Sequence, residues 1–135
     1  MSESAPQNTK KRFPKSRRLL RHSDFEKVYK QGKRHFATHM TVFYLRRDDV
    51  LEGPRVGFTV GKVLGGAVQR NRMKRRLREA VRLTPVQQEA AVDVVINPKR
   101  ALLKADFNEL QREVTRAFQV IEKSLEKQVE KEKQR

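Results

Sequence analysis

The feature that most constrains the fold is a segment in which densely spaced cations are interrupted by apolar residues at helical spacing. Within residues 70–78 most side chains are Lys or Arg, yet at about 100° per residue Met73, Leu77 and Ala80 fall on one stripe. One face of such a helix can pack against a core while the other stays in solvent. We therefore predict a helix over residues 67–83.

The opposite face of this helix favours the binding of anions. It carries Asn71, Arg75, Arg78 and Arg82, and Glu79 is the one acidic residue in the segment. A solvated surface helix usually mixes charges to gain ion pairs, and here only Glu79 offers a negative partner. The whole chain has a formal net charge of +16 on 135 residues, and a polyanion would relieve that self-repulsion. Nucleic acid is the default partner, and the anionic surface of a membrane is the alternative.

Length and composition narrow the class of protein further. A hydrophobic content of 36% can build one small core, and no apolar run is long enough to cross a bilayer. The chain has no cysteine, which excludes disulfides, thiolate metal sites and cysteine nucleophiles. Its polar N-terminus lacks the apolar stretch of a signal peptide. We expect a cytoplasmic protein with no membrane partner.

The N-terminal third predicts an arm followed by a helix. Residues 1–18 are polar and basic with little to bury, so we expect them to be disordered. The run that begins at Ser23 has the form of a capping box, in which its hydroxyl accepts from the amide of Glu26. A helix should start there and end at Gly32.

Four segments predict strands, because they are rich in β-branched and aromatic residues or alternate in polarity. They are residues 33–36, 40–45, 55–60 and 92–96. The second and third are separated by a turn-forming segment, and an antiparallel pair between them is the simplest outcome.

A last helix is predicted from residue 105 onward. Its buried stripe would consist of Phe107, Leu110, Val114, Ala117, Phe118 and Ile121. Beyond about Glu122 the sequence alternates Glu and Lys, so the helix should extend into solvent. The order of elements is α-β-β-β-α-β-α, which indicates an α+β sandwich of a few helices on one sheet.

The residues offer no recognisable site for catalysis by the protein. Its histidines are His22, His35 and His39, and we expect none of them to pair with a carboxylate. Asp48 and Asp49 fall in the turn-forming segment and Asp93 in a strand, so no dense acidic cluster is present to hold magnesium ions. We predict no metal site in the protein itself.

Two further patterns leave alternatives open. Residues 61–66 lack the ending of a P-loop, and either bring backbone amides and Lys62 near a phosphate or form a simple turn. Phe25 and Tyr29 lie four residues apart on the first helix, with Phe43 on a strand expected nearby. These aromatic rings are ordinarily core residues, but their basic surroundings also suit a stacking platform for unpaired bases.

Two sequence motifs, separated by a specific number of residues, allow a family to be suggested. They are Arg55-Val56-Gly57-Phe58-Thr59-Val60 and the segment of residues 65–80, which contains Arg70-Asn71-Arg72. In residues and spacing they closely resemble the signature of the bacterial ribonuclease P protein subunit. The resemblance covers about residues 19–121 and includes the pattern of Phe25, Tyr29 and Gly32.

The resemblance implies a fold and a division of the chain. The expected fold is a single-domain α-β-β-β-α-β-α sandwich, ribosomal protein S5 domain 2-like. It would have a left-handed β-α-β crossover around the basic helix, against the right-handed rule. Residues 1–18 would be a basic arm, 19–121 the ribonuclease P protein domain, and 122–135 a charged C-terminal helical tail.

The resemblance also implies a function. The protein would be the RNA-binding subunit of a ribonucleoprotein endoribonuclease, a hydrolase in tRNA processing, in which a catalytic RNA removes the 5′ leader of precursor tRNA. The partners would be these two RNAs, without DNA or membrane, and Mg²⁺ would be held mainly by RNA. No catalytic residue is expected in the protein.

By the same resemblance, two groups of residues would contact RNA. The catalytic RNA or the cleavage site would meet Lys62, Arg70, Asn71, Arg72, Lys74, Arg75 and Arg78. The single-stranded leader would meet Phe25, Tyr29 and Phe43. The family commonly has serine, a second lysine and asparagine where this chain has Gly61, Val63 and Gly66. A ribosomal-type RNA-binding protein without a role in tRNA processing is the first alternative, and a protein-only nuclease is the second.

Overall fold

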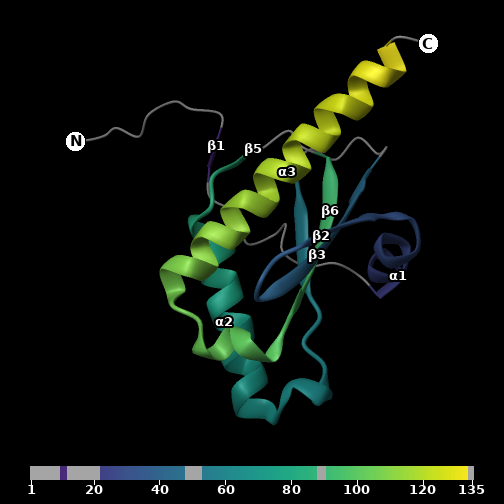
Figure 1. Cartoon of the computed structure of the whole chain (residues 1–135). Helices are drawn as coiled ribbons and strands as arrows, with labels where there is room; N and C mark the ends of the chain where they lie inside the picture. The colour runs from purple at the N-terminus through teal and green to yellow at the C-terminus, as the bar shows by residue number, and fades with distance from the viewer. Residues whose placement is uncertain (1–9, 12–21, 48–52, 88–90, 134–135) are drawn as a thin grey trace.

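The computed structural model describes residues 10–11, 22–47, 53–87 and 91–133, which form an α+β fold (Figure 1). In chain order the elements are β1 (Lys10–Lys11), α1 (His22–Gln31), β2 (Lys33–Phe36), β3 (Met40–Arg46), β4 (Arg55–Phe58), η2 (Lys62–Leu64), α2 (Ala67–Leu83), β5 (Val86–Gln87), β6 (Val92–Pro98), η3 (Arg100–Lys104) and α3 (Phe107–Lys133). Both η elements are short 3₁₀ helices. The predicted helices and strands are therefore present, with shifts at several ends.

The main sheet has the strand order β2-β3-β6-β4. β3 is antiparallel to both β2 and β6, whereas β4 is parallel to β6. The predicted antiparallel pair of β3 and β4 is therefore wrong, because β6 lies between them. Nearly all of β6 is buried, and such an apolar strand is stable in the centre of a sheet rather than at its edge.

The parallel pair of β4 and β6 follows from the connection between them. A helical crossover returns the chain to the same end of the sheet, and here α2 forms that crossover. The left-handed crossover implied by the resemblance stays a prediction. The basic helix thus lies between two neighbouring parallel strands in the chain, and it packs against α3, η2 and η3.

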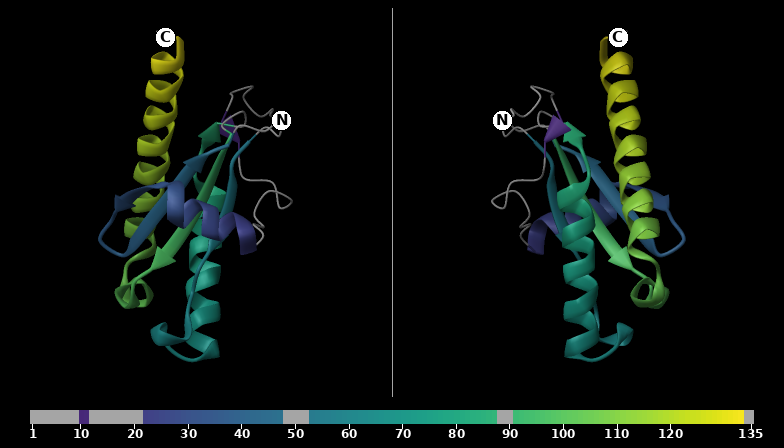
Figure 2. Two further views of the ribbon diagram at one scale, coloured as in Figure 1. Left: turned by 90° about the vertical axis from the view of Figure 1, so that its right-hand side faces the viewer. Right: turned by 90° about the vertical axis from the view of Figure 1, so that its left-hand side faces the viewer.

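The sheet separates α1 from α2 and α3. In both views of Figure 2 the sheet lies between α1 and α2. Met40, Val42 and Tyr44 alternate along β3 and point to the core under α2 and α3. On the other face α1 contacts β3 and β6 through its buried Val28.

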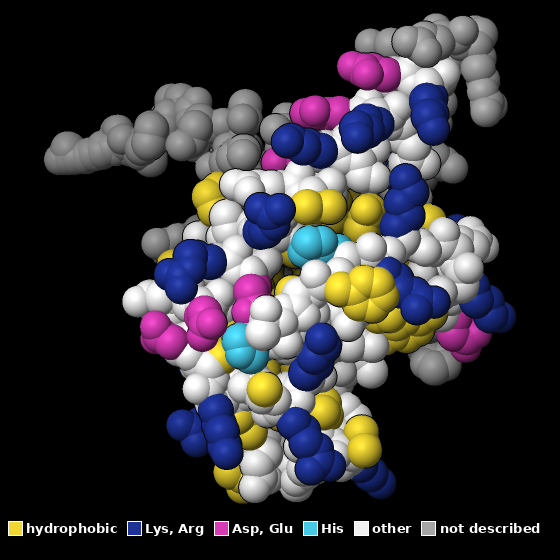
Figure 3. Space-filling view, in the orientation of Figure 1, with side chains coloured by type: hydrophobic (Ala, Val, Ile, Leu, Met, Phe, Trp, Pro, Cys, Tyr) yellow, Lys and Arg dark blue, Asp and Glu magenta, His cyan; other side chains and the backbone are white. Residues whose placement is uncertain are grey.

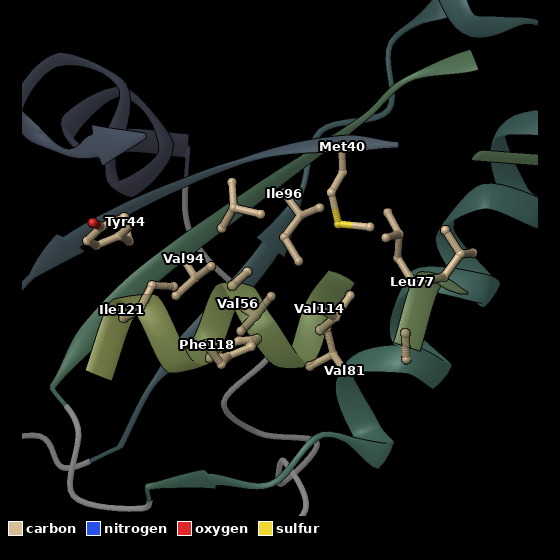
Figure 4. Close-up of a cluster of buried hydrophobic side chains, with 14 of the residues drawn as sticks. Met40, Tyr44, Val56, Leu77, Val81, Val94, Ile96, Val114, Phe118 and Ile121 are labelled. Atoms are coloured by element: carbon tan, nitrogen blue, oxygen red, sulfur yellow. The ribbon is translucent and has the colours of Figure 1, made fainter. Parts of the chain in front are cut away.

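The core lies between the sheet and the two long helices. In Figure 4, Met40 and Ile96 of the sheet face Leu77 of α2, with Val114 and Phe118 of α3 beside them. The predicted stripe of α2 is confirmed, since Met73, Leu77 and Ala80 are fully buried. The stripe of α3 is also confirmed: Leu110, Val114, Ala117, Phe118 and Ile121 are buried, and Phe107 packs against them.

The ends of α1 show one correct and one wrong prediction. The helix begins at His22, so Ser23 lies within it rather than at the predicted N-cap position. Its end at Gly32 is confirmed, with the amide of Gly32 donating to the carbonyl of Val28 at 2.8 Å. A Cβ at Gly32 would lie 2.5 Å from that oxygen and 2.6 Å from the carbonyl oxygen of Tyr44. Glycine is therefore required where the chain passes close to β3.

Both terminal segments carry structure. β1 pairs antiparallel with β5, so Lys10 and Lys11 differ from the structureless arm that the sequence suggests, and the rest of that arm lies outside the described residues. α3 continues through Lys133 and extends past the sheet, as predicted for the charged tail (Figure 1). The proposed division of the chain at residues 18 and 121 stays a prediction.

Candidate RNA-binding surfaces

The first candidate surface is the solvent side of α2, which we call the basic face: Asn71, Arg72, Lys74, Arg75 and Arg78. All but the half-buried Lys74 are exposed. In the part of the chain that the structure describes, Arg75 and Arg78 have no ion pair or hydrogen bond. The burial of the opposite stripe fixes this orientation, because turning the helix would expose Met73 and Leu77 to water. The arrangement presents unpaired cations on a rigid helix.

Two other arginines of α2 serve the fold. Arg76 donates to the carbonyl oxygens of Leu102 at 2.7 Å, Leu103 at 3.1 Å and Ala105 at 2.6 Å. These carbonyls lie at the end of η3 and just after it, and that of Leu102 also accepts from the amide of Ala105 at 3.3 Å. Arg70 donates from Nε to the carbonyl oxygen of Gly65 at 3.2 Å. This bond gives Arg70 a structural role beside its predicted RNA contact, whereas Arg72 forms no side-chain hydrogen bond within the described part of the chain.

The charge of Arg82 is paired with that of Glu79, the one acidic residue of α2. Its Nε and NH2 groups donate to the two carboxylate oxygens of Glu79 at 2.9 and 2.5 Å. This hydrogen-bonded pairing, together with the Glu79 charge, raises the pKa of Arg82 above its ordinary value. The free charge of the helix is thereby concentrated on the basic face.

The lead-in to α2 places Lys62 in solvent. Lys62 lies in η2, and the carbonyl oxygen of the following Val63 accepts from the Arg100 guanidinium at 2.5 Å. Gly65 has φ of 138°, a conformation that side chains other than glycine rarely adopt. Gly66 is the N-cap of α2 and makes no side-chain capping bond. Both sequence interpretations of this loop, a turn and a phosphate contact, are compatible with this geometry.

The second candidate surface consists of Phe25, Tyr29 and Phe43, between α1 and the sheet. The resemblance predicts that it binds the leader, and we call it the leader cleft. All three side chains are half-buried. The rings of Tyr29 and Phe43 meet edge to face, with centroids 4.9 Å apart and planes at 89°. The Arg34 guanidinium lies over the Phe43 ring, 5.7 Å from its centroid. The three rings are neither fully in the core nor fully open.

The hydroxyl of Tyr29 is held by two residues that sequence reasoning missed. It donates to Asn97 Oδ1 at 3.0 Å and lies 2.7 Å from Thr59 Oγ1. A phenol has one proton, so the Thr59 hydroxyl must donate to the tyrosine oxygen. This chain of bonds fixes the ring. No local pattern could reveal it, because the partners are 30 and 68 residues away.

The acidic residues near the sheet are structural. Arg47 NH1 donates to Asp93 Oδ1 at 3.0 Å, and Arg55 donates to both oxygens of Asp93 at 2.8 and 2.7 Å. Arg55 also lies 3.5 Å from Asp24 of α1. These contacts join β3, β4 and β6 to the first helix. Among the described residues no group of three or more His, Asp or Glu could hold a metal ion.

The histidines depart from expectation at one position. Both carboxylate oxygens of Glu113 are bound by His39, one by its backbone N–H at 3.0 Å and the other by ring Nδ1 at 2.5 Å. The prediction that no histidine pairs with a carboxylate is therefore wrong for His39, because the fold brings in a residue 74 positions away. This pair ties the β2–β3 turn to α3. The side chain of His22 lies outside the described part.

Comparisons with known proteins identify the family of the chain. A family model described as Ribonuclease P matches residues 13–122. The chain is 37% identical to the ribonuclease P protein component of Syntrophus aciditrophicus over 100 residues, 74% of this chain and 82% of the relative. It is 38% identical to that of Acidothermus cellulolyticus over 104 residues, 77% and 87% of the two chains.

Solved structures agree on the fold. The RNase P protein of Staphylococcus aureus superposes with a TM-score of 0.66 at 23% identity, over 79% of this chain and 96% of that one. The Thermotoga maritima protein superposes with a TM-score of 0.63 at 24% identity, over 75% and 94%. No helix within the described ranges is long and apolar enough to span a membrane.

The α+β fold and the family matches together define an RNA-binding protein. More particularly, the chain belongs to the ribonuclease P protein family. It is the protein component of a ribonucleoprotein endoribonuclease, which acts with an RNA subunit in the 5′ processing of tRNA. Its partners are accordingly RNA. The ribosomal-type alternative is not supported.

Proposed function

We propose that the protein binds two RNAs on different sides of its sheet. The basic face, with Lys62 and Arg70 beside it, contacts the catalytic RNA near the cleavage site. The leader cleft receives the single-stranded 5′ leader of precursor tRNA. The observation that carries this proposal is the exposure of Arg75 and Arg78, without partners in the described chain, on a helix whose other side is fully buried.

The basic face lowers the electrostatic cost of bringing two polyanions together. Each phosphate that a Lys or Arg neutralises releases condensed counterions, which favours binding most at low salt. Because α2 is anchored by its buried stripe and by Arg76, its cations keep their spacing when RNA approaches. The protein's residues thus position RNA, while bond cleavage belongs to the catalytic RNA.

The leader cleft suits a strand without base pairs. The half-buried rings of this cleft and the Arg34 guanidinium are planar groups, and a base can stack on a face that they leave open. Stacking accepts any base, because each has a π-face, so the cleft can serve precursors with different leaders. Phe25 lies one helical turn before Tyr29 and extends this surface.

Two further predictions concern the metal ion and the cellular location. Mg²⁺ would be held mainly by RNA, as the resemblance implies, and three of the described carboxylates, those of Asp93, Glu79 and Glu113, are already engaged by arginine or histidine. The cytoplasmic location inferred from composition stays a prediction.

Reconstitution tests the proposal. The full chain is added to a bacterial ribonuclease P RNA at a low Mg²⁺ concentration, at which that RNA alone cleaves precursor tRNA poorly. We expect the protein to promote cleavage at the 5′ end of the mature tRNA. No stimulation would refute the proposed function, and cleavage by the RNA-free protein would establish the protein-only alternative.

A further inference from the structure

A hollow outside both surfaces lies beside the edge strand β2, against α3. Its volume is about 420 Å³, and its lining residues are His35, Phe36, Ala37, Thr38, Glu113 and Arg116. Pockets for small ligands commonly span roughly 300 to 1,000 Å³, so a single nucleotide fits this space. None of the residues of the basic face or the leader cleft lines it.

Phe36 provides a free aromatic surface at this hollow. Its side chain is 67% exposed, whereas Phe118 of the core is 3% exposed. On the face shown in Figure 3, histidine side chains lie next to hydrophobic surface, with Lys and Arg side chains around it. An isolated exposed phenylalanine is common, but one that lines a cation-bearing hollow is suited to stacking.

The charges of the hollow favour one phosphate. Arg116 is exposed and, among the described residues, forms no ion pair or hydrogen bond. Both oxygens of Glu113 are engaged by His39. The negative charge of this carboxylate limits the number of phosphates that the hollow can accept to the one that Arg116 can neutralise. Burial, and then the charge of Arg116, lower the pKa of His35, so its imidazole is neutral at pH 7 and can form hydrogen bonds. The Thr38 hydroxyl is exposed beside it.

We propose that this hollow binds one unpaired ribonucleotide, whose base stacks on Phe36 and whose phosphate pairs with Arg116. The imidazole of His35 and the hydroxyl of Thr38 meet the sugar or the base edge. This inference rests on the proposed function, because the nucleotide comes from one of the same two RNAs. It adds a third contact, on the α3 side of β2.

The test compares Phe36→Ala and Arg116→Ala with Lys127→Ala. Lys127 is an exposed cation on the same helix, eleven residues on, or about 16 Å along the axis. Two dissociation constants are measured at fixed salt: that of the full chain for a bacterial ribonuclease P RNA, and that of the reconstituted holoenzyme for precursor tRNA. Phe36→Ala and Arg116→Ala should both weaken the same one by roughly 5- to 100-fold, and Lys127→Ala by less than about twofold. The affinity that changes identifies which RNA supplies the nucleotide.

Two more variants distinguish aromatic stacking from simple filling of the site by an apolar side chain. Phe36→Trp should retain binding and Phe36→Leu should lose it, with all melting temperatures unchanged because the side chain is exposed. The inference is overturned if Phe36→Leu binds like the wild type, if Phe36→Ala and Arg116→Ala affect different affinities, or if both match Lys127→Ala. If one of these outcomes is found and the wild-type chain still stimulates cleavage, only nucleotide binding in the hollow is refuted. Should it give no stimulation, the proposed function itself fails.

Discussion

The basic face and the leader cleft are built in opposite ways. The cations of the basic face come from one continuous helix, and the periodicity of that helix alone decides which side chains face solvent. The leader cleft draws on α1, β3, the end of β4 and β6, and its central residue Tyr29 is fixed by partners far along the chain. An electrostatic surface can be encoded locally, whereas an aromatic cleft of defined geometry needs the whole fold. The basic face should therefore tolerate damage to the sheet better than the cleft.

The largest effect is expected from the network that joins α1 to the sheet. Asp93→Asn would remove the carboxylate charge that Asp93 places against the buried Arg47 guanidinium and against Arg55. Breaking a buried pair in this way costs about 3–5 kcal/mol, measured as the free energy of unfolding in urea. Glu79→Gln, which removes the exposed partner of Arg82, is the control and should change stability far less. Equal effects of the two variants would refute a special role for the buried network.

The next effect concerns the basic face alone. Lys74→Ala/Arg75→Ala should weaken binding of the catalytic RNA by about tenfold per lost phosphate contact at 0.1 M salt, hence roughly a hundredfold. Lys123→Ala/Lys127→Ala removes the same charge from exposed positions of α3 and should change this affinity much less. A loss of the same size in both pairs would show that net charge, not the basic face, determines binding.

A smaller effect is expected at the cleft. Tyr29→Ala or Phe25→Ala should weaken binding of leadered tRNA to the holoenzyme by about 1–3 kcal/mol, because one stacked base loses its platform. Mature tRNA, which has no leader, is the comparison and should bind as before. If both tRNAs weaken together and the melting temperature falls, these rings are core residues instead.

The smallest effect separates the ring of Tyr29 from its hydroxyl. Tyr29→Phe keeps the edge-to-face contact with Phe43 but removes the bonds to Thr59 and Asn97, each worth about 0.5–1.5 kcal/mol. The free energy of unfolding should fall by the sum of the two, about 1–3 kcal/mol, and leader affinity should fall less than in Tyr29→Ala. A stability and a leader affinity equal to those of the wild type would contradict the role of the hydroxyl in positioning the ring.

Sequence patterns predicted those parts of the molecule in which neighbours along the chain determine the outcome. The stripe of Met73, Leu77 and Ala80, the end of α1 at Gly32 and all four strands of the main sheet follow from periodicity and backbone conformation. The position of β6 between β3 and β4 does not, because strand order depends on which strand is buried on both faces.

For the candidate sites the same division holds. The exposure of Arg75 and Arg78 is predictable from the helix, and the structure agrees. The pairing of His39 with Glu113, and the bonds that hold Tyr29, arise between residues 30 to 74 positions apart. Their individual side chains carry no local signal for such contacts, so the sequence could supply candidates for the cleft but not its geometry.

The central claim is that the cations of the basic face neutralise phosphates of the catalytic RNA. The most direct test is the salt dependence of the dissociation constant for that RNA. For Lys74→Ala/Arg75→Ala the slope of log affinity against log salt should fall by about 2 relative to the wild type, and for Lys123→Ala/Lys127→Ala it should stay the same. A slope unchanged by the first pair would contradict the claim.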